Sequence, residues 1–185
     1  MGDWFIRLIA PELEHEGAEK AKRAAEEHLI SNGFVLPARQ DCVLGGDGTG
    51  FPPGPRFQEL FARPVQSLGL WTNGVRISAT RDIEFADPGQ TEFALFCPDC
   101  RSRLEMPPWH AWQQAMTSYM SGGSGLLRCP HCDGTHRVDE WVYVPEVGFT
   151  RFRIEFWNTP PLRQDRIREL SEAVGCRLQV VHGKL

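Results

Sequence analysis

The sequence predicts an α+β fold formed by a single domain over residues 1–185. A strand-like run followed by a helix-like run occurs near each end of the chain, and two cysteine pairs lie between these units. At 185 residues and 41% apolar, the chain is long enough to bury a core without disulfides. The order of these runs indicates one α+β domain in which the cysteine-bearing part is an insertion.

The N-terminal unit is predicted to be a buried strand and a long helix. The apolar run WFIRLIA (4–10) predicts the strand, and Pro11 then opens a helix, since proline is tolerated in a first helical turn. The dipeptide Asn32-Gly33 predicts that the helix ends near Ser31. Mostly small residues recur at helical spacing and predict a close approach to a sheet. This stripe comprises Leu13, Gly17, Ala21, Ala25 and His28.

The dipeptide Asn73-Gly74 separates two strand-like runs in the middle of the chain. Asn-Gly tolerates the positive φ angles of a two-residue turn, so the sequence predicts a β-hairpin here. In the second run, Val75 and Ile77 are directed toward one face of the expected strand.

The C-terminal unit is predicted to be a strand, a helix and a final strand. Apolar and charged residues alternate in FTRFRIEFW (149–157), which predicts a half-buried strand. Pro160 and Pro161 introduce a helix over about 162–174, and RLQVVH (177–182) predicts the last strand. Together, the two terminal units predict a split βαβ sheet of the ferredoxin-like kind, with both helices on one face.

Four of the six cysteines fall in two Cys-x-x-Cys pairs, CPDC and CPHC. Two intervening residues let both thiolates of a pair face one ion, while the following backbone amides can hydrogen-bond the sulfurs. Two such pairs form the ligand set of a tetrahedral structural zinc site, and four thiolates leave no open position for catalysis. The predicted ligands of one structural zinc ion are Cys97, Cys100, Cys129 and Cys132.

These pairs and the strand-like runs around them make residues 93–145 resemble the zinc-ribbon class. The resemblance implies that the four cysteines are the ligands and that the flanking strands form the hairpins of the ribbon. Arg101 follows the first pair where glycine is frequent in this class. The pairs are also widely separated, and an extra helix at about 108–120 accounts for the additional residues. We therefore expect an inserted zinc-ribbon subdomain over 93–145.

Other interpretations of the cysteines are redox-active pairs and unligated thiols. CPHC is also the active-site motif of thiol oxidases that resemble thioredoxin, but residues 133–135 break the helix that this chemistry needs. A histidine in place of one cysteine ligand is not expected, because His131 would point outward from its pair and His136 is expected to start the following strand. Cys42 and Cys176 have no partner pattern and are predicted to be free thiols.

Charge and hydropathy argue against several classes of function. The formal net charge is −4, and only residues 146–185 carry a slight excess of Lys and Arg, so a strongly basic nucleic-acid-binding domain is not expected. No run approaches the roughly 20 apolar residues of a membrane span, and the N-terminus lacks the pattern of a secretory signal. The sequence predicts a cytoplasmic protein without a membrane partner.

The Gly-rich segment VLGGDGTGFPPGP (43–55) contains a GGDGT motif. This motif resembles the phosphate-binding loop of diacylglycerol and NAD kinases. Here FPPGP follows at once, and its prolines remove backbone donors and prevent the loop from leading into a helix. A kinase is therefore not expected, and Asp47 and Phe51 are expected to line an exposed loop.

A candidate partner surface combines apolar residues of the predicted 108–120 helix with exposed residues elsewhere. Large apolar side chains and arginine are frequent in protein interfaces, although an apolar stripe also packs in cores. The candidate residues are Trp109, Trp112, Met116, Phe51, Arg151 and Arg153.

Three functions follow from these features. The first is a zinc-stabilised module without a catalytic role that binds a protein partner, as an adaptor or an immunity-like protein. The second is a nucleic-acid-binding zinc-ribbon protein that uses the C-terminal arginines. The third is an enzyme with a pocket near residues 45–55. The sequence contains no catalytic motif for this enzyme, since it has no Ser-His-Asp order, His-Glu-x-x-His or Rossmann glycine motif.

Overall fold

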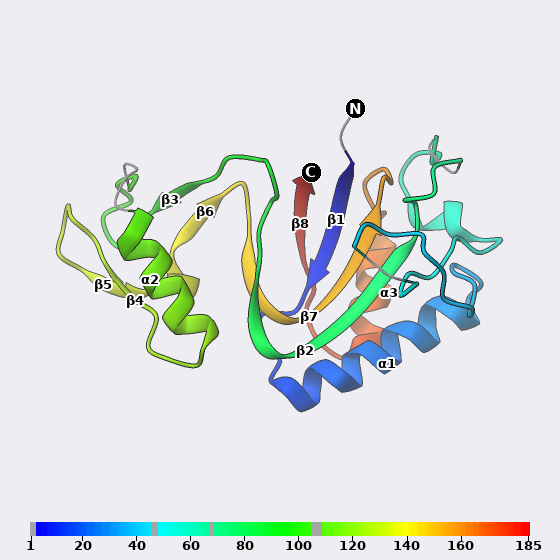
Figure 1. Ribbon diagram of the computed structural model, residues 1–185, viewed down its shortest axis with the longest axis horizontal. Helices are drawn as coiled ribbons and strands as arrows, with labels where there is room; N and C mark the ends of the chain where they lie inside the picture. Colours follow the sequence, from blue (N-terminus) through cyan, green and yellow to red (C-terminus); the bar gives the residue numbers. More distant parts are fainter. Residues whose placement is uncertain (1–2, 46–47, 67–68, 105–108) are drawn as a thin grey trace.

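The protein is α+β, as the sequence predicts. The computed structural model describes residues 3–45, 48–66, 69–104 and 109–185, and of Trp109 it describes the backbone only. Figure 1 shows a larger lobe in which helices cover a sheet, and a smaller lobe that contains a further helix. None of the described helices combines the length and the apolar character needed to cross a membrane.

The chain contributes helices and strands to both lobes. The larger lobe contains β1 (Trp4–Ile9), α1 (His15–Ser31), the 3-10 helix η1 (Phe57–Leu60), β2 (Val75–Ala86), β7 (Gly148–Trp157), α3 (Gln164–Val174) and β8 (Gln179–Lys184). The smaller lobe contains β3 (Ala94–Phe96), α2 (Trp109–Met120), β4 (Leu126–Arg128), β5 (Thr135–Arg137), the 3-10 helix η2 (Val138–Glu140) and β6 (Val142–Val144).

The sheet of the larger lobe has four antiparallel strands in the order β2-β7-β1-β8. In β1, Leu8 pairs with Ile154 of β7 on one side and with Val180 of β8 on the other. The pairing of β2 with β7 shifts in register between Ala79 and Glu84. Both strands curve strongly in Figure 1, and their far ends lead to the smaller lobe.

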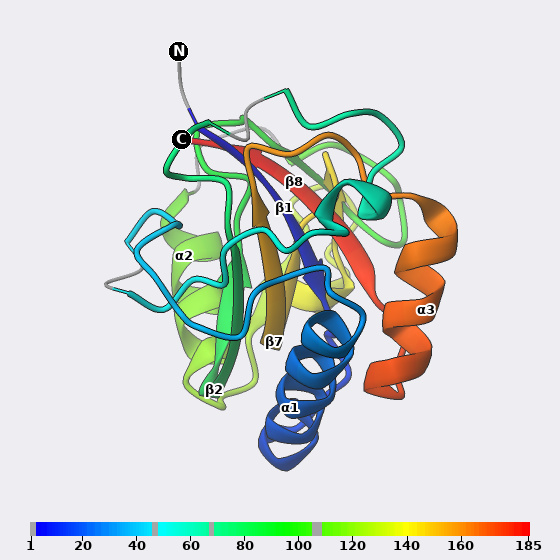
Figure 2. The same cartoon turned by 90° about the vertical axis from the view of Figure 1, so that its right-hand side faces the viewer.

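One face of the sheet is covered by α1 and α3, which lie side by side (Figures 1 and 2). The alternation in β7 buries Phe152, Ile154 and Phe156 against these helices. Of the predicted stripe on α1, Ala21 and Ala25 are buried, while Gly17 and His28 are only half-buried. The buried positions of α1 are Ala18, Ala21, Ala25 and Leu29. The stripe is therefore rotated slightly from the predicted one, which allows a close approach of helix and sheet.

The opposite face of the sheet carries the fully buried carboxylate of Glu155. Arg7 Nε donates a hydrogen bond to its Oε1 at 2.8 Å, Arg76 Nε donates to its Oε2 at 2.6 Å, and Arg153 Nε lies 3.6 Å from Oε2. Burial alone would raise the pKa of Glu155, but the charges of Arg153, Arg7 and Arg76 outweigh it and hold the pKa below its usual value. Glu155 is therefore an ionised buried group whose charge is balanced by its neighbours.

The predicted hairpin at Asn73-Gly74 is wrong. No strand lies directly before it, in the described residues 48–66 and 69–72. Asn73 is buried, and the Gly74 N–H donates to the carbonyl of Cys42 at 2.8 Å. A side chain at Gly74 would collide with Cys42. The glycine is needed for this close approach between distant segments, and β2 finds its partner strand in β7.

The smaller lobe has a separate apolar core. Trp112 of α2 lies in this core, and its indole N–H donates to the Tyr143 hydroxyl at 3.3 Å. Phe85 of β2 and Phe149 of β7 pack in the same core, with ring centroids 5.1 Å apart. The core thus extends to the ends of the long strands, and the boundary at 93–145 stays a prediction.

Candidate metal centre

The first cysteine pair lies in a tight turn that follows β3. The Cys97 N–H donates to the Ser102 carbonyl at 3.0 Å, and the Arg101 N–H donates back to the Cys97 carbonyl at 3.1 Å. This closure requires Arg101 to adopt a left-handed conformation with φ 59°. Arginine is unusual there because its Cβ crowds the backbone.

The second pair repeats this turn between β4 and β5. The Cys129 N–H donates to the Gly134 carbonyl at 2.8 Å, and the Asp133 N–H donates to the Cys129 carbonyl at 3.0 Å. Asp133 has φ 60°, so it occupies the left-handed position that Arg101 occupies in the first turn. The His131 N–H also points to the Cys129 sulfur at 3.5 Å, in the manner expected for amides that stabilise a thiolate.

The two turns bring all four sulfurs together. Cys97 Sγ lies 3.7 Å from Cys132 Sγ, and Cys100 Sγ lies 3.8 Å from Cys129 Sγ. All four sulfurs lie within 4.8 Å of one another. A zinc–sulfur length of about 2.3 Å implies sulfur–sulfur distances of about 3.8 Å in a tetrahedron. The four cysteines can therefore hold a single metal ion.

The thiols of this cluster differ in burial and in acidity. Cys97 and Cys129 are buried, whereas Cys100 and Cys132 are exposed, which leaves one side of the cluster open to an incoming ion. Hydrogen bonds from Ser102 lower the pKa of Cys100 to about 6. For Cys132, a hydrogen bond from the Gly134 amide lowers the pKa, but partial desolvation and the neighbouring thiols outweigh it and raise the pKa to about 12. Neighbouring sulfurs resist full deprotonation unless a cation balances their charge.

The two turns are also linked by a pair of polar side chains outside the four-sulfur set. His136 Nε2 lies 2.7 Å from Asp99 Oδ2, and these side chains group with Cys97 rather than with all four sulfurs. His136 connects one turn to the other, and His131 is exposed. His136 thus belongs to a second group with Cys97 and Asp99, beside the group of four cysteines.

Replacing Arg101 with glycine is expected to stabilise the zinc-loaded smaller lobe by about 0.5–1 kcal/mol, because glycine adopts a left-handed conformation without crowding. The measurement is thermal unfolding of the zinc-loaded protein. Arg103→Gly is the matched control, since Arg103 pairs with Phe96 in an isolated β-bridge and gains nothing from glycine. Equal or lower stability of Arg101→Gly would contradict the strain inferred from φ.

The candidate partner residues do not form one surface. Phe51 and Trp112 are 2% and 5% exposed, so this part of the prediction is wrong: both side chains fill apolar cores. Met116 is half-buried, and the side chain of Trp109 lies outside the described residues.

The two arginines of the candidate surface are held by neighbours. Arg151 contacts Glu14 at 3.3 Å, and Arg153 contacts Glu84 at 2.8 Å. Both side chains are about one-fifth exposed. They are therefore elements of a charged sheet face that is already paired.

The Gly-rich loop gives no pocket among the cavities of the described structure. Asp47 lies outside the described residues, and Phe51 bridges Val75 in the core. The five cavities found are lined by other segments of the chain.

Two surfaces with functional potential were not predicted. One is a groove between α2 and β2, and the other is a cavity at the end of the sheet near both termini. The predicted apolar stripe on α2 indicated part of the groove between α2 and β2. Neither has a complete sequence signal, because each combines residues that are far apart in the chain.

The fold and the cysteine cluster define an α+β protein with a site that can hold one metal ion. Comparison of the chain with protein-family models, with curated proteins and with solved structures gives no match. Function is therefore inferred from the residues of this chain alone.

Proposed function

We propose that this chain is a zinc-stabilised protein-binding module, with an adaptor or immunity-like role in the cytoplasm and no catalytic role. The observation that carries the proposal is a groove of about 700 Å³ between α2 and β2, called the α2 groove below. It is lined by Asp82, Ile83, Glu84, Phe85, Asp87, Met116, Thr117, Met120 and Ser121.

Zinc is proposed to stabilise the smaller lobe rather than to act on a substrate. The spacing of the sulfurs fits zinc, and four thiolates fill every tetrahedral position. The ion would tie the turn after β3 to the turn between β4 and β5, and so support the lobe that presents α2.

The α2 groove suits a partner segment with apolar and basic residues. Met116 and Met120 are half-buried, and flexible methionines adapt to varied apolar partners. The lining includes three carboxylates and no Lys or Arg. Glu84 already accepts from Arg153, so the exposed Asp82 and Asp87 would attract the basic residues of the partner.

Replacing both methionines, as Met116→Ser with Met120→Ser, is expected to weaken partner binding by about tenfold or more, because apolar anchors dominate interface energies. The measurement is native co-purification with and without nuclease, with crosslinks mapped to α2. Leu126→Ser is the matched control, since Leu126 is an exposed apolar residue of the same lobe, 54% exposed, outside the groove.

Nuclease-resistant capture that depends on the two methionines supports the proposal. Capture that is equal in the double variant and in wild type, or that is lost with nuclease, overturns it.

The two alternatives have weaker support. Besides Arg151 and Arg153, Arg163 pairs with Asp165 at 2.7 Å and Arg166 pairs with Glu169 at 2.6 Å, so these arginines offer little free charge to nucleic acid. An enzyme site near residues 45–55 has no cavity to support it among those found.

Two finer points of architecture belong to the same proposal. The similar cysteine turns, one of them within the β4–β5 hairpin, support a zinc-ribbon-like lobe. The antiparallel order β2-β7-β1-β8, with α1 and α3 on one face, supports a ferredoxin-like split βαβ sheet. A crystal structure of the zinc-loaded protein tests both.

A further inference from the structure

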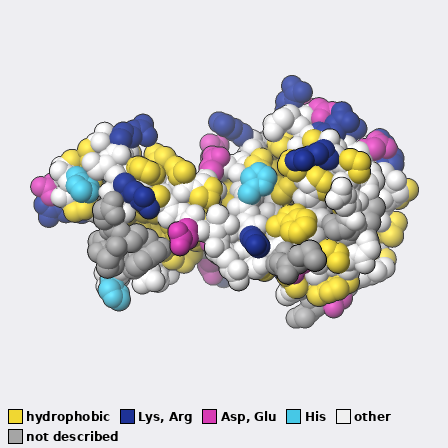
Figure 3. All heavy atoms as spheres, turned by 90° about the horizontal axis from the view of Figure 1, so that it is seen from above, with side chains coloured by type: hydrophobic (Ala, Val, Ile, Leu, Met, Phe, Trp, Pro, Cys, Tyr) yellow, Lys and Arg dark blue, Asp and Glu magenta, His cyan; other side chains and the backbone are white. Residues whose placement is uncertain are grey.

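A cavity of about 460 Å³ lies at the end of the sheet where β1 begins and β8 ends. Its walls include Trp4, Ile6 and Pro160, and more apolar than polar surface faces the interior. In Figure 3, which looks onto this end of the larger lobe, hydrophobic side chains lie close to basic and histidine side chains. This volume is in the range of sites that take small organic molecules.

The charge of this cavity differs from that of the rest of the molecule. Its lining contains Arg63 and His182 and no carboxylate, although the chain has a net charge of −4. Each of the other four cavities found has at least one Asp or Glu in its wall. Among the five cavities found, this one has the lining that best suits an anion.

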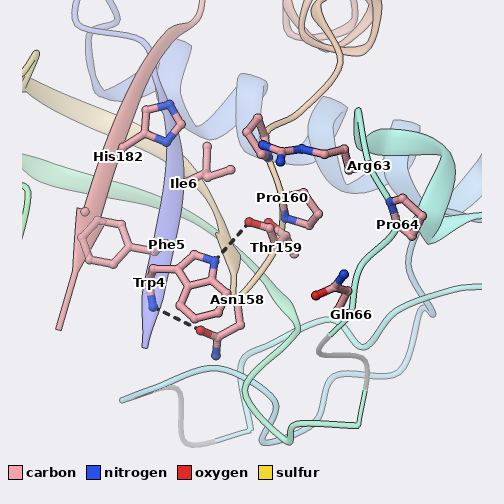
Figure 4. A pocket seen from close by; sticks show the side chains of 12 residues that line it. Trp4, Phe5, Ile6, Arg63, Pro64, Gln66, Asn158, Thr159, Pro160 and His182 are labelled. Atoms are coloured by element: carbon pink, nitrogen blue, oxygen red, sulfur yellow. Dashed lines mark hydrogen bonds between the residues drawn. The ribbon is translucent and has the colours of Figure 1, made fainter. Parts of the chain in front are cut away.

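The side chains of Arg63 and His182 are available to a ligand. Figure 4 shows the Arg63 side chain extending toward the side of the cavity on which His182 lies. Both residues are exposed, and neither side chain makes an ion pair or hydrogen bond within the part of the chain that the structure describes. An arginine and an imidazole that face one space can together bind a carboxylate.

The aromatic wall is held in place before any ligand arrives. The Trp4 indole is 42% exposed, yet its Nε1–H donates to the Thr159 carbonyl at 3.2 Å (Figure 4). The Trp4 backbone N–H donates to Asn158 Oδ1 at 3.1 Å. Asn158 has a left-handed φ of 53° and is held by hydrogen bonds from its side chain to Thr72 and Asp3. Such a preorganised wall favours binding because little side-chain entropy is lost.

We propose that this cavity binds an organic acid made of an aromatic or apolar ring and a carboxylate. The ring lies against Trp4 and Pro160, and the carboxylate lies between Arg63 and His182. The site is separate from the α2 groove and does not depend on the proposed protein-binding function. The same chemistry belongs to a free small acid and to the C-terminal residue of a peptide, and the experiment distinguishes these sources.

The test uses 1-naphthaleneacetate and its neutral analogue 1-naphthaleneacetamide, titrated into the zinc-loaded full chain by calorimetry and by NMR. A ligand of this size is expected to bind with a Kd near 1 mM or below, and the acid at least about tenfold more tightly than the amide. Arg63→Gln is expected to weaken binding of the acid by about tenfold, and Trp4→Ala to weaken both compounds. Arg168→Gln removes an exposed arginine of α3 outside the cavity and is expected to change neither.

Equal binding of acid and amide, no binding of either at several times the expected Kd, or equal effects of Arg63→Gln and Arg168→Gln would each overturn the proposal. Acetyl-Ala-Phe with a free carboxylate identifies the source. If it binds as tightly as the naphthalene acid, the site takes a peptide C-terminus, and if it binds far more weakly, the site takes a free acid. Either outcome supports the proposed chemistry.

Discussion

Cys97→Ser and Cys132→Ser are each expected to release zinc and unfold the smaller lobe, while the four-stranded sheet persists. The two cysteine turns come from different segments and meet at the four-sulfur cluster and at the Asp99–His136 contact. Removal of one thiolate breaks a closed tetrahedral set, and metal binding to such sites is coupled to about 10–16 kcal/mol of apparent free energy. The sheet has its own core with α1 and α3, so it does not depend directly on the ion.

Two measurements check this result. Metal analysis should give about one zinc ion per chain for wild type and nearly none for the variants. Hydrogen exchange should show lost protection over residues 93–145 and retained protection in β1, β7 and β8. Cys176→Ser is the matched control, because Cys176 is a free thiol outside the cluster and packs against the core of the larger lobe. Full zinc content in Cys97→Ser would remove Cys97 from the ligand set.

Glu155→Gln is expected to destabilise the sheet by about 3–5 kcal/mol, since it leaves the charges of two partly buried arginines without their buried counter-charge. Arg7 and Arg76 are 11% and 20% exposed at the side chain, and both direct their Nε toward Glu155. The measurement is urea unfolding followed by circular dichroism. The control, Asp165→Asn, breaks the exposed pair with Arg163 and is expected to have little effect. If the two variants lost a comparable free energy of unfolding, the buried ion pairs of Glu155 would contribute no more than the exposed pair of Asp165.

The same carboxylate predicts a dependence on pH. Because its pKa is lower in the folded protein than the ordinary 4.5, the stability that Glu155 contributes is fully present above that value and is lost as pH falls through its folded pKa. Wild type should therefore lose stability more steeply than Glu155→Gln as the pH is lowered below about 4.5. Parallel pH profiles for the two proteins would contradict an ionised Glu155.

The pattern of the sequence was enough to locate the strands and helices of both terminal units, although α1 begins at His15 and not at Pro11. The helix after Pro160-Pro161 was predicted over about 162–174, and α3 spans Gln164–Val174. The periodicity of apolar residues is a local property, so each helix or strand can be predicted from its own segment. The cysteine cluster was predictable for the same reason, since each pair is a local turn whose spacing already directs two sulfurs to one point.

Features that require contact between distant segments were not predictable in this way. Asn73-Gly74 has the composition of a hairpin turn, yet the segment packs against Cys42 instead. Phe51 and Trp112 are large apolar residues, and composition cannot distinguish a core aromatic from an exposed one. Their burial depends on which elements the chain brings to them.

The sequence established an α+β protein whose four cysteines can hold one metal ion, because periodicity and Cys-x-x-Cys spacing act over a few residues. Tertiary packing decided which side chains remain available to partners. It buried Phe51 and Trp112, and it paired Arg151 and Arg153 with acidic residues. It also placed Trp4, Arg63 and His182 around one cavity, although they lie near the start, the middle and the end of the chain. Long-range contacts of this kind arise from the burial of apolar surface by the whole fold, which no single segment encodes.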